Sequence, residues 1–224
     1  MEQALCRTKQ DARKIAPTPH LFAAYQAMFV HFNRALFEGK LPPIVLNFSR
    51  KAKTHGFFAP GRWTRAVDEA SSLRDGSPDR THEISLNPET TLRPPRDVAG
   101  TLAHEMAHLW QQVFGKPGRS GYHNREWAEK MRAIGLEPVS LDSKNGTGQK
   151  VTHTIIDGGR FDVAFGKLPP AALFPWRCVP EHRDVKPRTK TKYVCTPCDV
   201  NTWGKAGLSL VCGNCGVELE EITE

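Results

Sequence analysis

The sequence His104-Glu105-Met106-Ala107-His108 lies within residues 96–114, where apolar side chains recur with the period of an α-helix. Residues four apart lie on one helical face, so the two imidazoles can reach the same metal ion. Glu105 is offset by one position, close enough to contact a water molecule beside that ion. The pentad therefore predicts a zinc-dependent hydrolase, with His104 and His108 as ligands and Glu105 as the general base.

A third ligand is needed, because catalytic zinc usually takes three protein side chains. Gln111 and Phe114 occupy the positions at which the longer H-E-x-x-H-x-x-G-x-x-H pattern has Gly and His, so that pattern is absent. Downstream, His123, Glu126 and Glu129 are all candidates by spacing. His123 is favoured among them because neutral imidazole is a common zinc ligand.

Four cysteines form a second metal motif near the C-terminal end. Cys195-x-x-Cys198 is followed, after a short interval, by Cys212-x-x-Cys215. Four thiolates at this spacing predict a closed, structural zinc site. Because so short a segment buries little apolar surface, we expect metal binding to supply much of its folding free energy.

The remaining pattern predicts an α+β fold around the helix that carries the pentad. Residues 83–87 are interpreted either as an edge strand that pairs with an extended substrate or as an internal strand. Residues 151–165 could form a hairpin through the Asp-Gly-Gly turn at 157–159. The other expected elements are a long amphipathic helix over residues 20–37, short strands over 44–48, 56–58 and 63–67, and a helix from Asn124 to about residue 134.

Several ordered motifs resemble those of the SprT-like metalloproteases, which include bacterial SprT and the Spartan proteases of animals and plants. The resemblance rests on His-Glu-Met-Ala-His-Leu-Trp-Gln at 104–111, Gly-Tyr-His at 121–123 with Glu126-Trp127, Phe-Asn-Arg-Ala-Leu-Phe at 32–37 and Glu-Ile-Ser-Leu-Asn-Pro at 83–88. It covers most of residues 20–219. In that family the histidine of a Gly-x-His-x-x-Glu-aromatic motif is the third ligand, which implies His123 here.

The resemblance implies a zincin-like SprT metalloprotease domain followed by a zinc ribbon. We expect a flexible tail over residues 1–17, the protease domain over 18–140, a linker with a possible hairpin and a basic segment over 141–190, and the ribbon over 191–219. Two Zn²⁺ ions are expected, one catalytic and one structural. The implied activity is that of a zinc-dependent endopeptidase.

Spartan-type proteases cleave proteins crosslinked to DNA and restrict their activity through DNA contact, so the resemblance implies DNA-associated protein substrates. A net charge of +7 agrees with a polyanionic partner. Basic residues near the ribbon are interleaved with Phe174, Trp176, Tyr193 and Trp203, a combination typical of single-stranded nucleic acid binding. The residues alone equally allow a solvated basic linker, with Trp203 packed over the ribbon. Two alternatives stay open: a DNA-binding or regulatory protein with little protease activity, and a peptidase indifferent to DNA.

The location of the protein is an expectation from its hydropathy pattern. No apolar run approaches the roughly 18 to 20 residues of a membrane span. Residues 1–14 are polar and charged and lack the apolar segment of a secretory signal. We therefore expect a cytoplasmic protein, nucleoid-associated if bacterial, that is not secreted and has no membrane partner.

Overall fold

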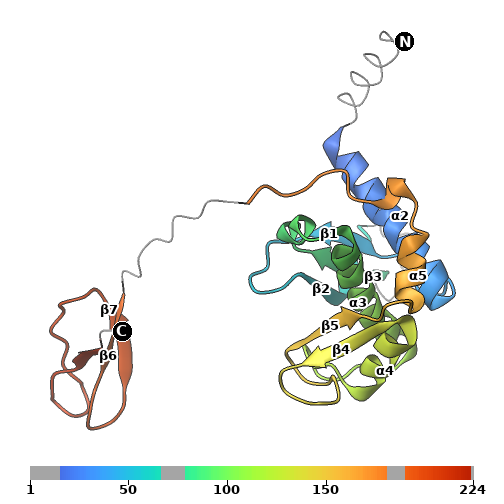
Figure 1. The fold of residues 1–224 in the computed structure, drawn as a ribbon. Coiled ribbons are helices and arrows are strands. Elements are labelled where there is room, and N and C mark those ends of the chain that lie inside the picture. The colour runs from blue at the N-terminus through green and yellow to red at the C-terminus, as the bar shows by residue number, and fades with distance from the viewer. Residues whose placement is uncertain (1–15, 67–78, 181–189, 223–224) are drawn as a thin grey trace. The chain divides into compact units, whose positions relative to one another are not determined.

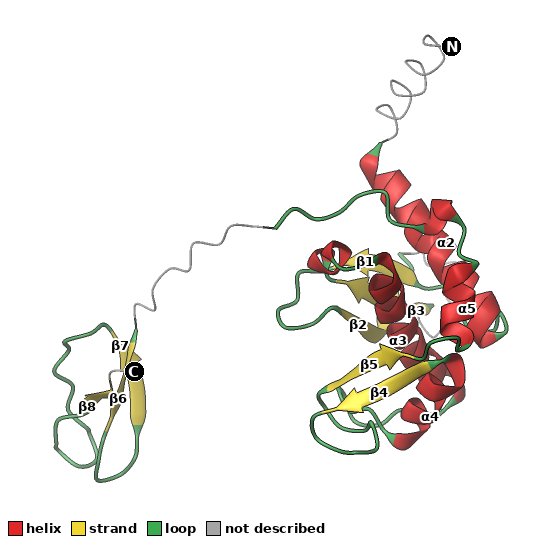
Figure 2. Cartoon of the chain, viewed as in Figure 1, coloured by secondary structure: helices red, strands yellow, loops and turns green. Residues whose placement is uncertain are grey.

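The computed structural model describes residues 16–66, 79–180 and 190–222, and the chain divides into two compact units, Met1–Pro180 and Glu181–Glu224. Helices and strands occur together in the first unit and strands alone are described in the second, as Figures 1 and 2 show. This content confirms the α+β class. None of the helices in the described part of the chain has the length and apolar character that a bilayer crossing requires.

In the described residues of the first unit, four α-helices, two short 3₁₀ helices and five strands enclose one core. In chain order its elements are α2 (Pro17–Phe37), β1 (Val45–Phe48), β2 (Gly56–Thr64), β3 (Arg80–Leu86), η2 (Pro88–Leu92), α3 (Pro95–Phe114), α4 (Arg125–Ile134), β4 (Leu136–Ser140), β5 (Val151–Ile155), α5 (Arg160–Gly166) and η3 (Pro170–Ala172).

The ends of α3 and α4 follow from local sequence, and both expected helices are confirmed. Pro95 opens α3, where a missing N–H costs no helical hydrogen bond. The Asn124 side chain accepts a hydrogen bond from the backbone N–H of Trp127 and so caps α4. Gly135 ends α4 with a φ of 93°, a conformation that glycine adopts without strain. Pro95 thus fixes where the helix with the pentad begins, and Asn124 fixes where the residues before α4 lie.

The three-stranded sheet has the order β1-β3-β2, which corrects the expectation of an edge strand at residues 83–87. β3 pairs in parallel with β1 and antiparallel with β2, so both of its edges carry hydrogen bonds. Residues 83–86 thus belong to an internal strand, which is the second of the two interpretations left open. β2 is an edge strand of this sheet instead.

The expected hairpin over residues 151–165 is wrong. β5 pairs antiparallel with the earlier strand β4, and the residues after the Asp-Gly-Gly turn form α5. The Asp162 side chain accepts a hydrogen bond from the backbone N–H of Gly158, which turns the chain from strand into helix. Because Phe161 of α5 is fully buried, this part of the expected linker over 141–190 belongs to the folded first unit.

Residues 1–15 of the expected tail over 1–17, and residues 181–189 of the expected linker, lie outside the described residues. Pro17 already belongs to α2, which begins three residues before the expected start. Proline suits the first position of a helix, and this accounts for the earlier start. The remaining domain bounds stay predictions.

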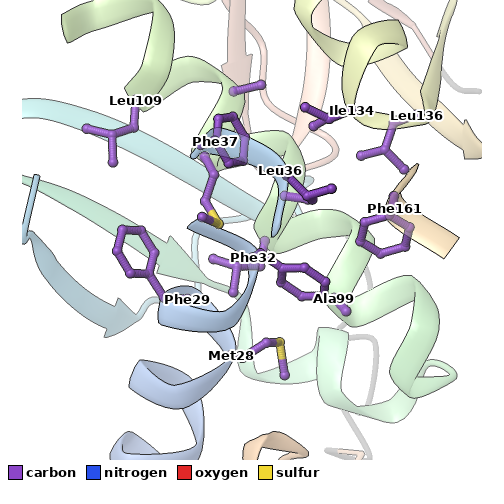
Figure 3. Close-up of a cluster of buried hydrophobic side chains, with 14 of the residues drawn as sticks. Met28, Phe29, Phe32, Leu36, Phe37, Ala99, Leu109, Ile134, Leu136 and Phe161 are labelled. Atoms are coloured by element: carbon purple, nitrogen blue, oxygen red, sulfur yellow. The ribbon is translucent and has the colours of Figure 1, made fainter. Parts of the chain in front are cut away.

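The core of the first unit draws on α2, α3, α4, β3, β4 and α5. Figure 3 shows Met28, Phe29, Phe32 and Leu36 of α2 among side chains from the other elements. Phe32 stacks on Phe161 with ring centroids 5.3 Å apart. Burial of large apolar side chains of this kind contributes roughly 1.5–3 kcal/mol each. The helix that carries the pentad is therefore held by a substantial apolar core.

The second unit is a three-stranded sheet of order β7-β6-β8 with a very small core. Its strands are β6 (Thr191–Val194), β7 (Asn201–Gly204) and β8 (Glu220–Ile222). Within residues 190–222, the buried cluster consists of Tyr193, Cys195, Cys212 and Leu219. Two of these four are cysteines of the predicted metal motif, so the apolar contribution to this unit is slight.

Candidate metal centre and substrate cleft

Three histidines from two neighbouring helical segments converge in the first unit. His104 and His108 lie one turn apart on α3, and His123 directly precedes the Asn124 cap of α4. One ring nitrogen from each lies within 4.8 Å of the others, an arrangement that could hold a metal ion. The ring centroids are 5.3 Å apart for His104 and His108 and 4.8 Å apart for His108 and His123.

Hydrogen bonds to Nδ1 orient two of these rings. His123 Nδ1 lies 3.1 Å from the Gly148 carbonyl oxygen, and His104 Nδ1 lies 3.2 Å from Nδ1 of His153. A neutral imidazole that donates through Nδ1 keeps a lone pair on Nε2. Metal-binding histidines are usually held by such bonds. The donor set therefore fits an ion such as Zn²⁺, bound through Nε2 of His104 and His123.

Burial keeps the three imidazoles neutral. It lowers the pKa of His108 to about 3, with His123 adding to the effect. Burial likewise lowers the pKa of His104 well below its usual value and that of His123 to a lesser degree. The fully buried Trp127 packs against all three rings, with centroids 4.4–5.0 Å away. Neutral rings in a fixed setting have the free lone pairs that a metal ion requires.

Glu105 lies beside this cluster and is only 6% exposed. Burial raises the pKa of its carboxyl to about 8, while the positive charge of Lys51 and a hydrogen bond from the Phe58 backbone oppose that rise. A divalent cation nearby would also oppose the rise in this pKa, because an opposite charge favours the carboxylate. The carboxyl can therefore exchange a proton near neutral pH.

The two glutamates that spacing left open as ligands lie outside the histidine cluster. Glu126 accepts hydrogen bonds from Gln111 Nε2 at 2.8 Å and from the Lys116 backbone at 2.7 Å. Glu129 is exposed and pairs with Arg125 at 2.7 Å. Both carboxylates are thus engaged in links within or next to α4. The structure brings His123 to the other two histidines in their place.

A cleft of about 770 Å³ runs along the edge strand β2. Phe58, whose backbone reaches Glu105, lines this cleft together with Lys51 and with Ser120 from the segment before His123. Glu83 also lines it and accepts hydrogen bonds from Trp63 Nε1 and Ser85 Oγ, both at 2.5 Å. The backbone of Phe58 and the positive charge of Lys51 thus link the lining of the cleft to Glu105.

The four cysteines of the second unit also converge. Their sulfur atoms lie within 4.8 Å of one another, and Cys198 Sγ is 3.7 Å from Cys212 Sγ. A tetrahedral ion with bonds of about 2.3 Å would place its sulfur ligands about 3.8 Å apart. Backbone N–H groups of Cys215 and Asn214 lower the pKa of the Cys212 thiol to about 7. This cluster is compatible with zinc and is closed by four thiols.

Sequence reasoning missed two groups that orient the histidines: the Gly148 carbonyl and the His153 ring. Both lie in residues 141–155, within the segment 141–190 that was expected to be a linker with a possible hairpin. A signal was present for His153, because Val151, His153 and Ile155 alternate with two exposed threonines. That period of two is typical of a strand with one covered face.

Two of the four aromatic side chains that were expected to stack on bases are packed inside the protein instead. Tyr193 is fully buried in the second unit, and its hydroxyl lies 2.6 Å from the Lys205 carbonyl oxygen. Phe174 packs against Tyr25 in the first unit, with centroids 5.4 Å apart. Neither ring is free to stack on a base. Trp203, at 59% exposed, and Trp176, at 45%, remain accessible.

Comparison with curated proteins and with solved structures finds no match. The model of the SprT-like family, in contrast, matches residues 25–153, which include all three histidines, Glu105 and both orienting groups. The match spans more than half of the 224 residues. On this evidence the chain belongs to the SprT-like family.

Proposed function

We propose that this protein is a zinc-dependent endopeptidase. One observation carries the proposal: three neutral imidazoles converge next to the buried carboxyl of Glu105, and the groups that act on this carboxyl, Phe58 and Lys51, line a cleft along β2. The same group of residues would serve an inert metal site poorly, since such sites are usually closed by four protein ligands. Here three side chains, His104, His108 and His123, would hold the ion, which is the number of protein ligands typical of catalytic zinc.

The chain's own residues supply the proton transfers. Zn²⁺ held by the three histidines would supply Lewis acidity to the scissile carbonyl and to the attacking water. Glu105 accepts the proton that the water loses as it attacks the peptide carbon. The same carboxyl then donates that proton to the departing amine nitrogen as the C–N bond breaks. A buried carboxyl with a pKa near neutrality suits both roles.

The cleft indicates how a peptide would be held. Within the described residues, β2 pairs only with β3, so its outer edge can hydrogen-bond to an extended peptide. Trp63, fixed by its bond to Glu83, offers a half-exposed ring in the cleft for an apolar side chain. An unfolded or locally extended segment of a protein is therefore the expected substrate.

The test is Glu105→Gln measured in the full chain, with zinc content and protein cleavage followed together. We expect zinc binding to persist and the cleavage rate to fall by about 10²–10⁴-fold, the usual contribution of a general base. Glu129→Gln is the matched control, because it makes the same chemical change at an exposed site on α4. Full cleavage by Glu105→Gln would refute the assigned role.

We further propose that the substrates are DNA-associated or DNA-crosslinked proteins and that the second unit contacts single-stranded DNA. Trp203 is the support in that unit, since it is 59% exposed and sits opposite Lys192 in the β6–β7 register. A cation beside an exposed aromatic ring can hold a phosphate and stack a base. The basic residues of 181–189 lie outside the described residues.

Binding of a fluorescent single-stranded oligonucleotide tests this part. Trp203→Ala should weaken binding by roughly 5–150-fold, the range expected when about 1–3 kcal/mol of stacking is lost. Val211→Ala is the control, because Val211 is an exposed apolar side chain of the same unit that cannot stack. Cleavage unaffected by DNA would favour the peptidase indifferent to DNA. Binding by a wild-type protein that cleaves nothing would favour the regulatory alternative.

A further inference from the structure

His153 lies against the metal centre although it is not one of the three converging histidines. It sits on β5, and its ring centroid is 5.3 Å from that of His104 on α3. The two Nδ1 atoms are 3.2 Å apart, a hydrogen-bond distance. β5 thus contributes a side chain to the layer behind the metal ligands.

Chemistry fixes the direction of this hydrogen bond. When His104 presents the lone pair of Nε2 to a metal ion, its proton must be on Nδ1. Nδ1–H of His104 then donates to Nδ1 of His153, which carries its own proton on Nε2. The bond selects both the tautomer and the orientation of the His104 ring.

Gly100 provides independent evidence that space is kept for His153. Gly100 lies one turn before His104 in the interior of α3, where glycine costs about 1 kcal/mol relative to alanine. A Cβ at this position would lie 2.9 Å from Nε2 of His153, closer than such atoms normally approach. The absent side chain therefore allows the imidazole to lie on the helix and reach His104.

We propose that His153 is a positioning residue for the metal centre: it accepts the Nδ1–H of His104, and Gly100 makes room for it. The proposal rests on the proposed function of the three histidines as metal ligands. The equivalent partner of His123 is a backbone carbonyl, at Gly148, which substitution cannot remove. His153 is thus the side chain through which the orientation of a ligand can be tested.

The experiment measures zinc affinity of the full chain by chelator competition, with unfolding of the metal-free protein as a second readout. His153→Phe keeps a ring but has no acceptor, and we expect about 10–100-fold weaker zinc binding at the histidine site. His153→Asn places an amide oxygen near the position of Nδ1 and should restore most of the affinity. His31→Phe is the matched control, because that ring contacts the Ala164 carbonyl on α5 instead.

Gly100→Ala tests the same contact from the other side. It should increase the helical propensity of α3 yet weaken zinc binding, because the new methyl displaces the His153 ring. Added to His153→Phe, it should cause no further loss of affinity, since both changes act through one hydrogen bond. Occupancy of the thiolate site, followed by Co²⁺ charge-transfer absorption, should stay constant in every variant.

The outcomes separate this proposal from the proposed function. Wild-type zinc affinity in a folded His153→Phe protein would overturn the positioning role alone. If His153→Phe does not fold, the other two variants decide. Equal zinc affinity of the wild-type, His153→Asn and Gly100→Ala proteins would then also overturn the positioning role. A wild-type protein that binds no ion at the histidine site would overturn both proposals.

Discussion

The two clusters of potential metal ligands differ in the size of the apolar core that holds them in place. The histidines of the first unit lie on elements held by an apolar core that draws on α2, α3, α4, β3, β4 and α5. The cysteines of the second unit belong to a buried cluster of four residues, in which Cys195 and Cys212 are themselves half of the membership. The first cluster is therefore organised by the fold, whereas the second cluster must largely organise it.

This difference separates the two uses of a metal ion. An ion in the histidine cluster can be lost without removing what holds α3 in place, as suits a reactive centre. An ion in the cysteine cluster would connect two segments that have little else to bury together, and its binding free energy would be folding free energy.

Metal removal should have the largest effect. Structural zinc contributes about 10–16 kcal/mol in small zinc-binding peptides, more than the second unit can supply by burial. Chelation should therefore abolish the protection of amides in β6 and β7 against hydrogen exchange, while α3 stays protected. Hydrogen exchange followed by mass spectrometry measures both in one sample.

Cys212→Ser should reproduce this loss without chelator, and Cys178→Ser should not. Cys178 is the control because it lies in the first unit, outside the cysteine cluster. Protected strands in the second unit after complete removal of metal would break the contrast, since they would show that the small core suffices.

Phe32→Ala should destabilise the first unit by about 3–5 kcal/mol, the usual cost of truncating a buried phenylalanine. Phe32 is fully buried and stacks on Phe161. Denaturant unfolding of the metal-loaded protein measures the change. Leu141→Ala, at a side chain that is 87% exposed, should cost less than about 0.5 kcal/mol. A similar small cost for Phe32→Ala would mean that the core does not hold the site.

The same contrast explains what could be predicted from the sequence. His104, Glu105 and His108 were predictable because ligands four apart on a helix need only helical geometry, and the four cysteines because their spacing is local. Residues 141–155 were not, because the partner strand of β5 and the acceptors at Gly148 and His153 depend on tertiary pairing. The same limit applies to β3, whose central place depends on which strands flank it.

Acid should destabilise the metal-free first unit. Burial lowers the pKa of His108 to about 3, so the unfolded chain, with an ordinary pKa near 6.5, binds a proton more readily. The stability contributed by the neutral ring is present above pH 6.5 and is lost as the pH falls toward 3. From pH 6.5 to pH 5 the loss from this ring is about 2 kcal/mol.

Urea unfolding of the chelated protein at several pH values measures this slope. His31→Phe should leave it unchanged, because His31 lies away from the cluster, against α5. His108→Gln should make it less steep, since one of the buried histidines that take up a proton on unfolding is gone. An unchanged slope in His108→Gln would show that another group is responsible.

Tyr193→Phe should have the smallest effect, and it tests how much of the second unit is held without metal. The hydroxyl donates to the Lys205 carbonyl at 2.6 Å and accepts from the Leu208 backbone at 3.0 Å, joining β6 to the turn after β7. Losing these bonds should cost about 1 kcal/mol, a typical net value for a hydrogen bond. Because folding and metal binding are coupled there, the cost should appear as about fivefold weaker zinc affinity at the thiolate site. Tyr122→Phe, the same change in the first unit, should leave that affinity unaltered. Unaltered zinc affinity in Tyr193→Phe would mean that the ion supplies almost all of the stability of the second unit. A much larger loss would show that hydrogen bonds contribute substantially to it.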